Sequence, residues 1–427
     1  MGGWVDLDVI RNFILLLFIG LVFWSCGEAE DPDTSNIIEC SLDTLFSREV
    51  GGPGNTDGYD IERLDDCSYV GVGKSSSRPW IMKIDEAGNE IWSKIFEEVP
   101  IPQGNYGSGH QYATALDATT DGGFILCTSV STNHPSYNST GFIIKTDSSG
   151  ATEWITELPS NRTHHGKDII QTIEGDYVVV GTWFVSSAET SQKSAFMARY
   201  TESGSLSWIE HYGGACDEDV FNAVIQKDDG GFIAVGQFEH EGGVYNCDFY
   251  GYTDLWFVST DSEGYLLYES MEGGPAWEEA TDILMLMDGS YAVSAKKRHT
   301  LNHPINAWLL NMDMTGNILW EWDEPDYSGG LRLGDDLQDI ILSGDGETIV
   351  AMGFTYDLPI DNIVPNVWAF DAVTSEQLWT NSYGGETGGT GRAGIVEAFD
   401  HGLVFFGYTN GKRLKIIKTD STGFTIE

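Results

Sequence analysis

Two distant stretches of the chain share one pattern: residues 80–92 read WIMKIDEAGNEIW, and residues 308–320 read WLLNMDMTGNILW. Each stretch begins with an aromatic and apolar strand, continues with Asp-x-x-Gly and ends on a second strand that carries Trp. Asp at the first position and Gly at the last are typical of a type I turn. The pattern therefore predicts two antiparallel strands joined by a tight turn.

Further copies of this pattern recur along the chain, and a second tight turn of the Asp-Gly kind precedes several of them. Four short strands per copy describe one blade of a β-propeller. Seven copies predict an all-β fold, a seven-bladed β-propeller over residues 44–427. The remaining copies centre on Asp147, Thr201, Asp261, Asp371 and Asp420, and the preceding turns contain Asp121, Asp229, Asp288 and Asp400.

The two ends of this region complement each other. The last copy stops at Glu427, before the position at which the other copies place the Trp of their outer strand. Residues 46–52 read FSREVGG and match residues 208–214, WIEHYGG, which follow the turn of another copy. We therefore expect the N-terminal segment to supply the outer strand of the last blade and to close the ring.

Residues 369–379, AFDAVTSEQLW, resemble the quinoprotein-like (PQQ-type) β-propeller repeat of bacterial surface lipoproteins. The resemblance covers roughly residues 44–427 and implies a propeller, with little indication of activity. Quinone-dependent members of that superfamily have eight blades, a disulfide between adjacent cysteines and a calcium-holding set beside the quinone. This chain has seven copies and no adjacent cysteines, so we expect no bound PQQ and no other cofactor.

The N-terminus resembles an export signal. The apolar run at residues 13–24 is too short to cross a membrane but suits the core of a signal peptide. It ends at Ser25-Cys26 before an acidic stretch, which resembles a bacterial lipoprotein signal. We expect a signal peptide over residues 1–25, a lipid on Cys26, a polar tether over 26–43, and an outer-membrane lipoprotein facing the surface or the periplasm. An ordinary secretory signal is the alternative.

Charge limits the partners. The chain has 22 Lys and Arg against 66 Asp and Glu, a formal net charge of −44. Such a surface repels phosphate backbones and anionic lipid, which excludes nucleic acid and leaves the lipid anchor as the only membrane contact. The hydrophobic fraction of 41% excludes global disorder.

The tight turns of a propeller share one face, and the long, individual loops share the other, so we expect the working surface on the long-loop face. Aromatic rings beside carboxylates suit sugar rings or a basic peptide. Strand capping on a solvated acidic surface is the structural alternative for the carboxylates. A further alternative is that Asp248 and Asp254 bind a calcium ion through their carboxylates. The candidate ligand-binding residues are Tyr250, Tyr252, Trp277, Trp183, Asp217, Glu218 and Asp219.

No catalytic motif appears, whether G-x-S-x-G, H-E-x-x-H or a P-loop. We interpret the adjacent His164 and His165 as polar loop residues rather than metal ligands, because no cysteine or second cluster accompanies them. The sequence favours a binding or interaction module for carbohydrate or protein. The alternatives are a carbohydrate-active enzyme with paired carboxylates over the ring mouth, and a purely structural scaffold.

The cysteines give a further prediction. In an exported protein, Cys216 and Cys247 fall on the long-loop face of one blade, so they are candidates for a disulfide. Cys40 and Cys67 lie near the closing strand and the neighbouring tight turn, and are the second candidate pair. Cys127 lies within a strand and is expected to be a buried free thiol.

Overall fold

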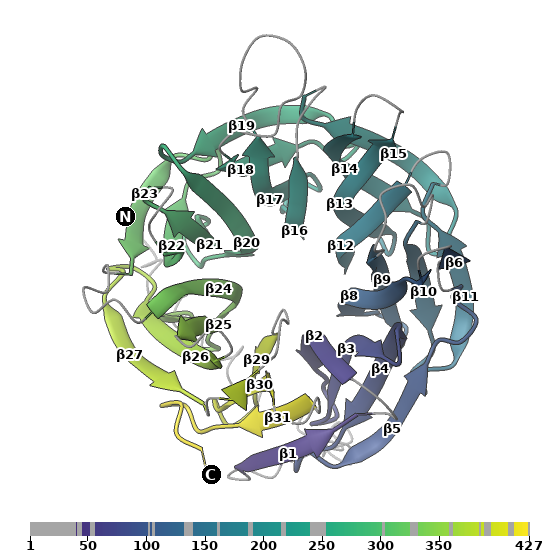
Figure 1. Ribbon diagram of the computed structural model, residues 1–427, viewed down its shortest axis with the longest axis horizontal. Helices are drawn as coiled ribbons and strands as arrows, with labels where there is room; N and C mark the ends of the chain where they lie inside the picture. Colours follow the sequence, from purple (N-terminus) through teal and green to yellow (C-terminus); the bar gives the residue numbers. More distant parts are fainter. Residues whose placement is uncertain are drawn as a thin grey trace, which may run out of the picture. The chain divides into compact units, whose positions relative to one another are not determined.

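Seven four-stranded antiparallel sheets follow one another around a ring, as the repeats predict (Figure 1). The blades belong to one compact unit within residues 41–427. The computed structural model describes residues 40, 45–51, 56–100, 103–104, 107–131, 140–159, 163–186, 191–214, 219–239, 253–300, 304–324, 332–357, 362–383, 386–387, 394–408 and 414–425.

Each blade begins with its innermost strand and ends on the rim. Blade 1 contains β2 (Thr56–Arg63), β3 (Tyr69–Ser75), β4 (Arg78–Ile84) and β5 (Glu90–Ile95). Blade 2 contains β8 (His110–Ala118), β9 (Phe124–Ser131), β10 (Phe142–Thr146) and β11 (Thr152–Glu157). Blade 3 contains β12 (Thr163–Gln171), β13 (Tyr177–Ser186), β14 (Ser191–Tyr200) and β15 (Leu206–Tyr212). Blade 4 contains β16 (Val220–Gln226), β17 (Phe232–Glu239), β18 (Thr253–Thr260) and β19 (Leu266–Glu272).

The remaining blades follow the same order. Blade 5 contains β20 (Trp277–Met285), β21 (Tyr291–Arg298), β22 (Asn306–Met312) and β23 (Ile318–Asp323). Blade 6 contains β24 (Arg332–Leu342), β25 (Thr348–Asp357), β26 (Asn362–Asp371) and β27 (Gln377–Ser382), with β28 (Glu386–Thr387) paired to β26. Blade 7 contains β29 (Ile395–Glu397), β30 (Leu403–Tyr408) and β31 (Leu414–Lys418), and β6 (Gln103–Gly104) pairs with β7 (Gly107–Ser108) outside the blades.

The N-terminal strand closes the ring. β1 (Phe46–Val50) pairs antiparallel with β31 as the fourth strand of blade 7, from Phe46 opposite Lys418 to Val50 opposite Leu414 (Figure 1). The expected closure is therefore confirmed. Pairing removes the exposed edge that β31 would otherwise present to solvent.

The Asp-x-x-Gly segments form the expected turns. In the turn of blade 1 the Asp85 carboxylate accepts the N–H groups of Ala87 (3.0 Å) and Asn89 (2.8 Å), and Gly88 N–H donates to the Asp85 carbonyl. Gly88 has a φ of +77°, a left-handed conformation that glycine adopts without steric cost. The strand register shifts by one residue beside the turn, so the third and fourth strands are joined through a type I turn and a bulge.

The core lies between the blades. Each of the seven hydrophobic clusters among the described residues joins two neighbouring sheets, so no blade has a core of its own. The repeated Trp takes part in this packing, because its ring covers the turn glycine of the next blade. A Cβ added to Gly150 would lie 2.6 Å from the ring of Trp92, and one added to Gly204 would lie 2.8 Å from Trp154.

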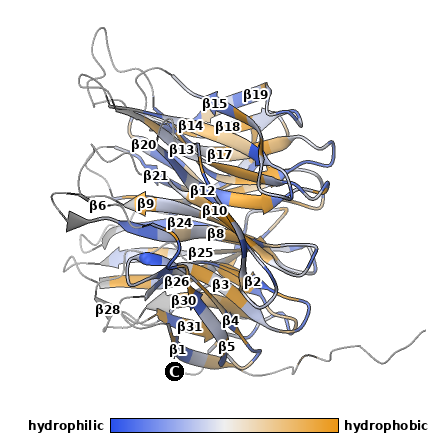
Figure 2. Ribbon diagram, turned by 90° about the vertical axis from the view of Figure 1, so that its right-hand side faces the viewer, coloured by the Kyte–Doolittle hydropathy of each residue, from blue (hydrophilic) through white to orange (hydrophobic). Residues whose placement is uncertain are grey.

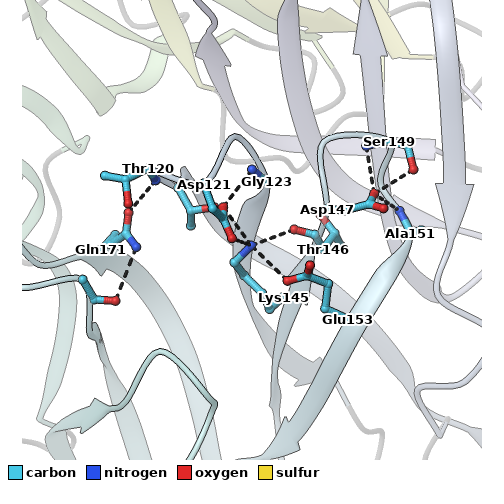
Figure 3. Close-up of polar contacts among 12 residues, drawn as sticks. Thr120, Asp121, Gly123, Lys145, Thr146, Asp147, Ser149, Ala151, Glu153 and Gln171 are labelled. Atoms are coloured by element: carbon cyan, nitrogen blue, oxygen red, sulfur yellow. Dashed lines mark hydrogen bonds and ion pairs between the residues drawn. The ribbon is translucent and has the colours of Figure 1, made fainter.

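Tight turns gather on one side of the ring, at the right in Figure 2. Figure 3 shows how blade 2 is held there: the buried Lys145 ammonium lies 2.9 Å from Asp121 and 3.3 Å from Glu153, and donates to the Thr146 carbonyl. Partial burial acts to raise the pKa of Asp121, but hydrogen bonds from Thr119 and Lys145 lower it to about 2. A similar pair, Lys418 with Asp400 at 2.6 Å, holds the corresponding turn of blade 7.

No helix in the described part of the chain has the length and apolarity of a membrane span.

Candidate functional site

Carboxylates surround the ring axis at one level. The first strand of each of blades 1 to 6 carries a one-residue bulge at the same place, between the residue pairs 58/60, 113/115, 166/168, 221/223, 280/282 and 337/339. In four of these blades the residue after the bulge is an aspartate that is half-buried beside the axis. These residues are Asp60, Asp168, Asp282 and Asp339.

Each axial aspartate connects its own blade to the next one. The Asp60 carboxylate accepts the N–H groups of Ile61 and Leu116, both at 2.8 Å. The same bonds link Asp168 to Val224 (2.8 Å), Asp282 to Ile340 (3.0 Å) and Asp339 to Ile395 (2.7 Å).

Side chains of other types make the connection where aspartate is missing. Thr114 Oγ1 donates to the Gly166 carbonyl at 3.1 Å, and Asn222 Nδ2 donates to the Ala280 carbonyl at 2.9 Å. At blade 7 the backbone itself approaches, because a Cβ on Gly394 would lie 2.7 Å from the Ile61 nitrogen. The axial carboxylates thus have structural partners around the ring.

Burial and the charges of neighbouring carboxyls raise the pKa values of Asp60, Asp168 and Asp339. Burial raises the pKa of Asp60 to about 7, against the opposing hydrogen bonds from Leu116 and Ile61, and the charge of Asp282 adds to the rise. Burial likewise raises the pKa of Asp168 to about 7. Burial and then the neighbouring Asp282 raise the pKa of Asp339 well above its usual range. Such groups carry protons near neutrality, as paired catalytic acids do.

A groove on the rim provides a more open candidate site. It has a volume of about 460 Å³ and lies where the end of β15 in blade 3 meets β18 and β19 of blade 4. This volume falls in the range of small-ligand pockets. The lining residues are Glu210, His211, Tyr212, Gly213, Gly214, Phe238, Trp256, Gly264, Tyr265, Leu266, Glu269 and Met271.

The base of the groove is a packed aromatic cluster. Trp256 is 1% exposed, stacks on Phe221 with ring centroids 4.9 Å apart and meets Phe238 edge to face at 5.3 Å. Trp256 Nε1 donates to Glu269 Oε2 at 3.3 Å, which orients a carboxylate at the wall. Tyr212 reaches across the blade boundary and donates its hydroxyl to the Gly264 carbonyl.

The rim of the groove is exposed and acidic. Tyr265 is 62% exposed, so most of its side chain is accessible to a ligand. Glu210 and Glu269 supply hydrogen-bond acceptors, and the lining contains no Lys or Arg. The exposed ring of Tyr265, with acceptors beside it, can hold a polyhydroxylated ring, whose faces are apolar and whose edge carries hydroxyl donors.

Three predicted ligand-binding residues lie in described strands or loops. Trp277 begins β20 and is half-buried. Trp183 lies in β13, where it packs beside His164 and His211. Asp219 is fully buried and accepts the N–H groups of Gly214 (3.0 Å) and Glu239 (2.9 Å), so its carboxylate holds the connection that borders the groove.

Other predicted site residues lie outside the described residues: Cys26, Cys216, Asp217, Glu218, Cys247, Asp248, Tyr250 and Tyr252. The lipid anchor, the localisation at the cell surface or periplasm and the first disulfide therefore stay predictions.

Asp254 is the second residue of β18. Burial and then the charge of Asp254 raise the pKa of Glu272, and the charge of Asp254 also adds to the rise that burial causes at Glu278. The expectation that His164 is a polar loop residue is wrong, because β12 begins at Thr163 and buries its imidazole. The described residues contain no cluster of three or more His, Cys, Asp or Glu arranged to hold a metal, and calcium binding stays a prediction.

The cysteines that the structure describes are either disulfide-bonded or free. Cys40 and Cys67 are each disulfide-bonded, and Cys127 is a buried free thiol as expected. Burial raises the pKa of the Cys127 thiol well above its usual range, which makes it unreactive.

The alternative with paired carboxylates over the ring mouth did not identify the axial aspartates as one set, and the groove was not predicted. An Asp-Ile pair recurs at 60–61, 168–169, 282–283 and 339–340, and this signal could have identified the axial set. The groove has no such signal, because it depends on how two neighbouring blades meet at the rim.

Comparisons with known proteins show a likeness in fold. No protein-family model and no curated protein sequence matches the chain. An ulvan lyase, described as a new family of polysaccharide lyase, superposes with a TM-score of 0.53 at 10% identity, over 88% of this chain and 97% of its own. The same enzyme bound to -[GlcA(1-4)Rha3S]- gives 0.52 at the same identity and coverage. A Hadza microbial sialidase gives 0.43 at 10% identity, over 81% and 74%. At these identities the two ulvan lyase structures support the β-propeller fold alone.

Proposed function

We propose that the protein is a carbohydrate-binding β-propeller that holds a neutral sugar chain in the groove between blades 3 and 4. The observation that carries this proposal is the groove itself, about 460 Å³ in volume, with an aromatic base, an exposed Tyr265 and two carboxylates at its wall. Such a lining offers stacking to sugar faces and acceptors to sugar hydroxyls.

Charge selects the class of sugar. Glu210 and Glu269 line the groove without a basic residue, on a chain whose net charge is −44. Uronate or sulfate groups would be repelled here, whereas neutral and amino sugars would not. The alternative that the sequence left open, a carbohydrate-active enzyme, is supported by the axial carboxyls with pKa values near 7, Asp60 and Asp168.

Calorimetric titration with neutral, amino and acidic oligosaccharides tests the proposal. We expect binding of a neutral or amino sugar, weakened about fivefold by Tyr265→Ala, since one stacked ring contributes about 1 kcal/mol. Tyr268→Ala is the matched control: Tyr268 is 54% exposed in β19, which begins directly after Tyr265, but does not line the groove.

The same samples are assayed for new reducing ends. Release of reducing ends would favour the enzyme and direct attention to the axial carboxyls. Equal weakening by the two tyrosine variants would place the binding outside the groove. Absence of binding to every sugar would overturn the proposal in favour of a protein partner or a scaffold.

A further inference from the structure

The outermost strand of blade 4 exposes a run of apolar side chains at the rim of the ring (Figure 1). Tyr265, Leu266, Leu267 and Tyr268 are 62%, 47%, 49% and 54% exposed, and the last three belong to β19. Each of β5, β15, β23 and β27 exposes one large apolar side chain, and β1 and β11 expose none. Adjoining exposed apolar residues indicate an interaction site, whereas single ones do not. We call residues 265–268 the β19 patch.

The exposure of Tyr268 has a structural cause. Tyr268 takes the place in β19 that Trp208 takes in β15, two residues after the strand begins. Trp208 packs on the turn glycine of the next blade, because a Cβ on Gly264 would lie 2.8 Å from its ring. A Cβ on Gly316, the turn glycine of blade 5, would instead meet the side chain of Ser270 first. Tyr268 is therefore left at the surface rather than packed between the blades.

The equivalent position of blade 5 shows what an ordinary outer strand exposes. The register of β19 shifts at Leu267, the extra residue of a bulge, and Leu319 is the extra residue at the same place in β23. Leu319 is 56% exposed, but its neighbours Ile318 and Trp320 are half-buried. Both neighbours of Leu267 are exposed. The two bulges therefore differ in the continuity of the apolar surface around them.

Carboxylates flank the β19 patch on both sides. Residues 261–272 contain no Lys or Arg but four acidic residues, Asp261, Glu263, Glu269 and Glu272. A second copy of the chain would bring the same carboxylates against these, and like charges repel each other. The charge around the patch therefore favours a partner that is basic as well as apolar.

Arginine fits this surface better than lysine does. Its planar guanidinium stacks on aromatic rings, here those of Tyr265 and Tyr268, and pairs with carboxylates through two parallel hydrogen bonds. Glu263 and Glu269, one on each side of the patch, are both exposed. Rings and carboxylates that a guanidinium can use thus lie side by side along the chain.

We propose that the β19 patch binds a segment of a partner protein in which Arg alternates with apolar residues. The apolar side chains of that segment cover Leu266 and Leu267, and its guanidinium groups stack on the tyrosines and pair with the flanking carboxylates. Leu267 and Tyr268 do not line the groove between blades 3 and 4, so this proposal is independent of sugar binding.

Fluorescence anisotropy with short labelled peptides, at about 0.15 M salt to screen long-range attraction, tests the proposal. One peptide alternates Arg with Val and Leu, and two others carry Lys or Glu in place of Arg. We expect the Arg peptide to bind at least about fivefold more tightly than the Lys peptide, and the Glu peptide not to bind.

Variants of the chain locate the binding. Leu267→Lys should weaken binding of the Arg peptide at least about tenfold, because it removes apolar contact and adds a like charge. Tyr268→Ala, which adds no charge, should weaken it about fivefold. Leu319→Lys is the matched control, since it places the same charge at the same bulge position of β23, and should change the affinity less than about twofold.

The control separates local recognition from overall charge. Equal weakening by the two lysine variants would mean that the net charge of −44 holds the peptide, and would overturn the proposal. Equal affinity for the Arg and Lys peptides, or binding of neither, would overturn it too. Sedimentation equilibrium tests the other occupant: a dimer that Leu267→Lys dissociates and Leu319→Lys does not would assign the patch to a second copy instead.

Discussion

At the scale of single residues, two separate factors can require glycine in a turn. Its positive φ is one, at +76° for Gly150 and +82° for Gly122. The second factor is close contact with a side chain of the neighbouring blade, which occurs at only some of the turn glycines. A Cβ on Gly150 would lie 2.6 Å from Trp92, whereas a Cβ on Gly122 would meet nothing within 4 Å. The two positions therefore separate backbone strain from packing between blades.

We predict that Gly150→Ala destabilises the protein by about 1–3 kcal/mol more than Gly122→Ala. Both variants place alanine in the left-handed region, at a similar backbone cost, and only the first also forces a methyl group against the indole of Trp92. Denaturant unfolding of the two variants measures the difference. Equal losses would mean that the indole moves aside freely and that the Trp–Gly contact does not hold the blades together.

At the scale of the element, β1 is short but its burial is uneven. Phe46 is 2% exposed and belongs to the cluster that joins blades 7 and 1, while Arg48 on the same strand is exposed. A Cβ on the turn glycine of blade 1, Gly88, would lie 2.6 Å from the Phe46 ring. Phe46 in the closing strand therefore packs on the turn glycine of the next blade, as Trp does in other outer strands.

We predict that Phe46→Ala lowers the free energy of unfolding by about 3–5 kcal/mol, the usual cost of removing a buried aromatic ring. Arg48→Ala should change it by less than about 0.5 kcal/mol, because the pairing of β1 with β31 is kept and the side chain is exposed. Thermal and denaturant unfolding measure both. A small effect of Phe46→Ala would mean that backbone pairing alone closes the ring.

The repeat predicted the blades and the closing strand because both follow from local rules, a turn motif and the strands beside it. It did not predict the bulges of the inner strands, since the extra residue differs in each blade: Tyr59, Thr114, Lys167, Asn222, Thr281 and Gln338. Trp183 was selected as a surface aromatic, and its contact with His211 could not be foreseen because the two residues lie on β13 and β15, which are not adjacent strands of blade 3.

At the scale of the whole molecule, the axial aspartates make the stability of the ring depend on pH. Their carboxylates accept backbone N–H groups of the next blade, yet burial raises the pKa values of Asp60 and Asp168 to about 7. A raised pKa means that the folded chain holds the proton more tightly than the unfolded chain, whose aspartates titrate near 4. The stability from this proton is complete below about pH 4 and is lost as pH rises through about 7.

We therefore predict that the melting temperature falls by a few degrees between pH 5 and pH 8 at constant ionic strength. Asp168→Asn should reduce this fall, because asparagine cannot ionise. Asp313→Asn is the control: hydrogen bonds from Asn317 and Thr315 lower the pKa of this half-buried turn aspartate to about 2, so it stays ionised throughout. Scanning calorimetry of the three proteins at both pH values measures the effect. An unchanged fall in Asp168→Asn would mean that the pH dependence arises from the net charge of −44 rather than from the axis of the ring.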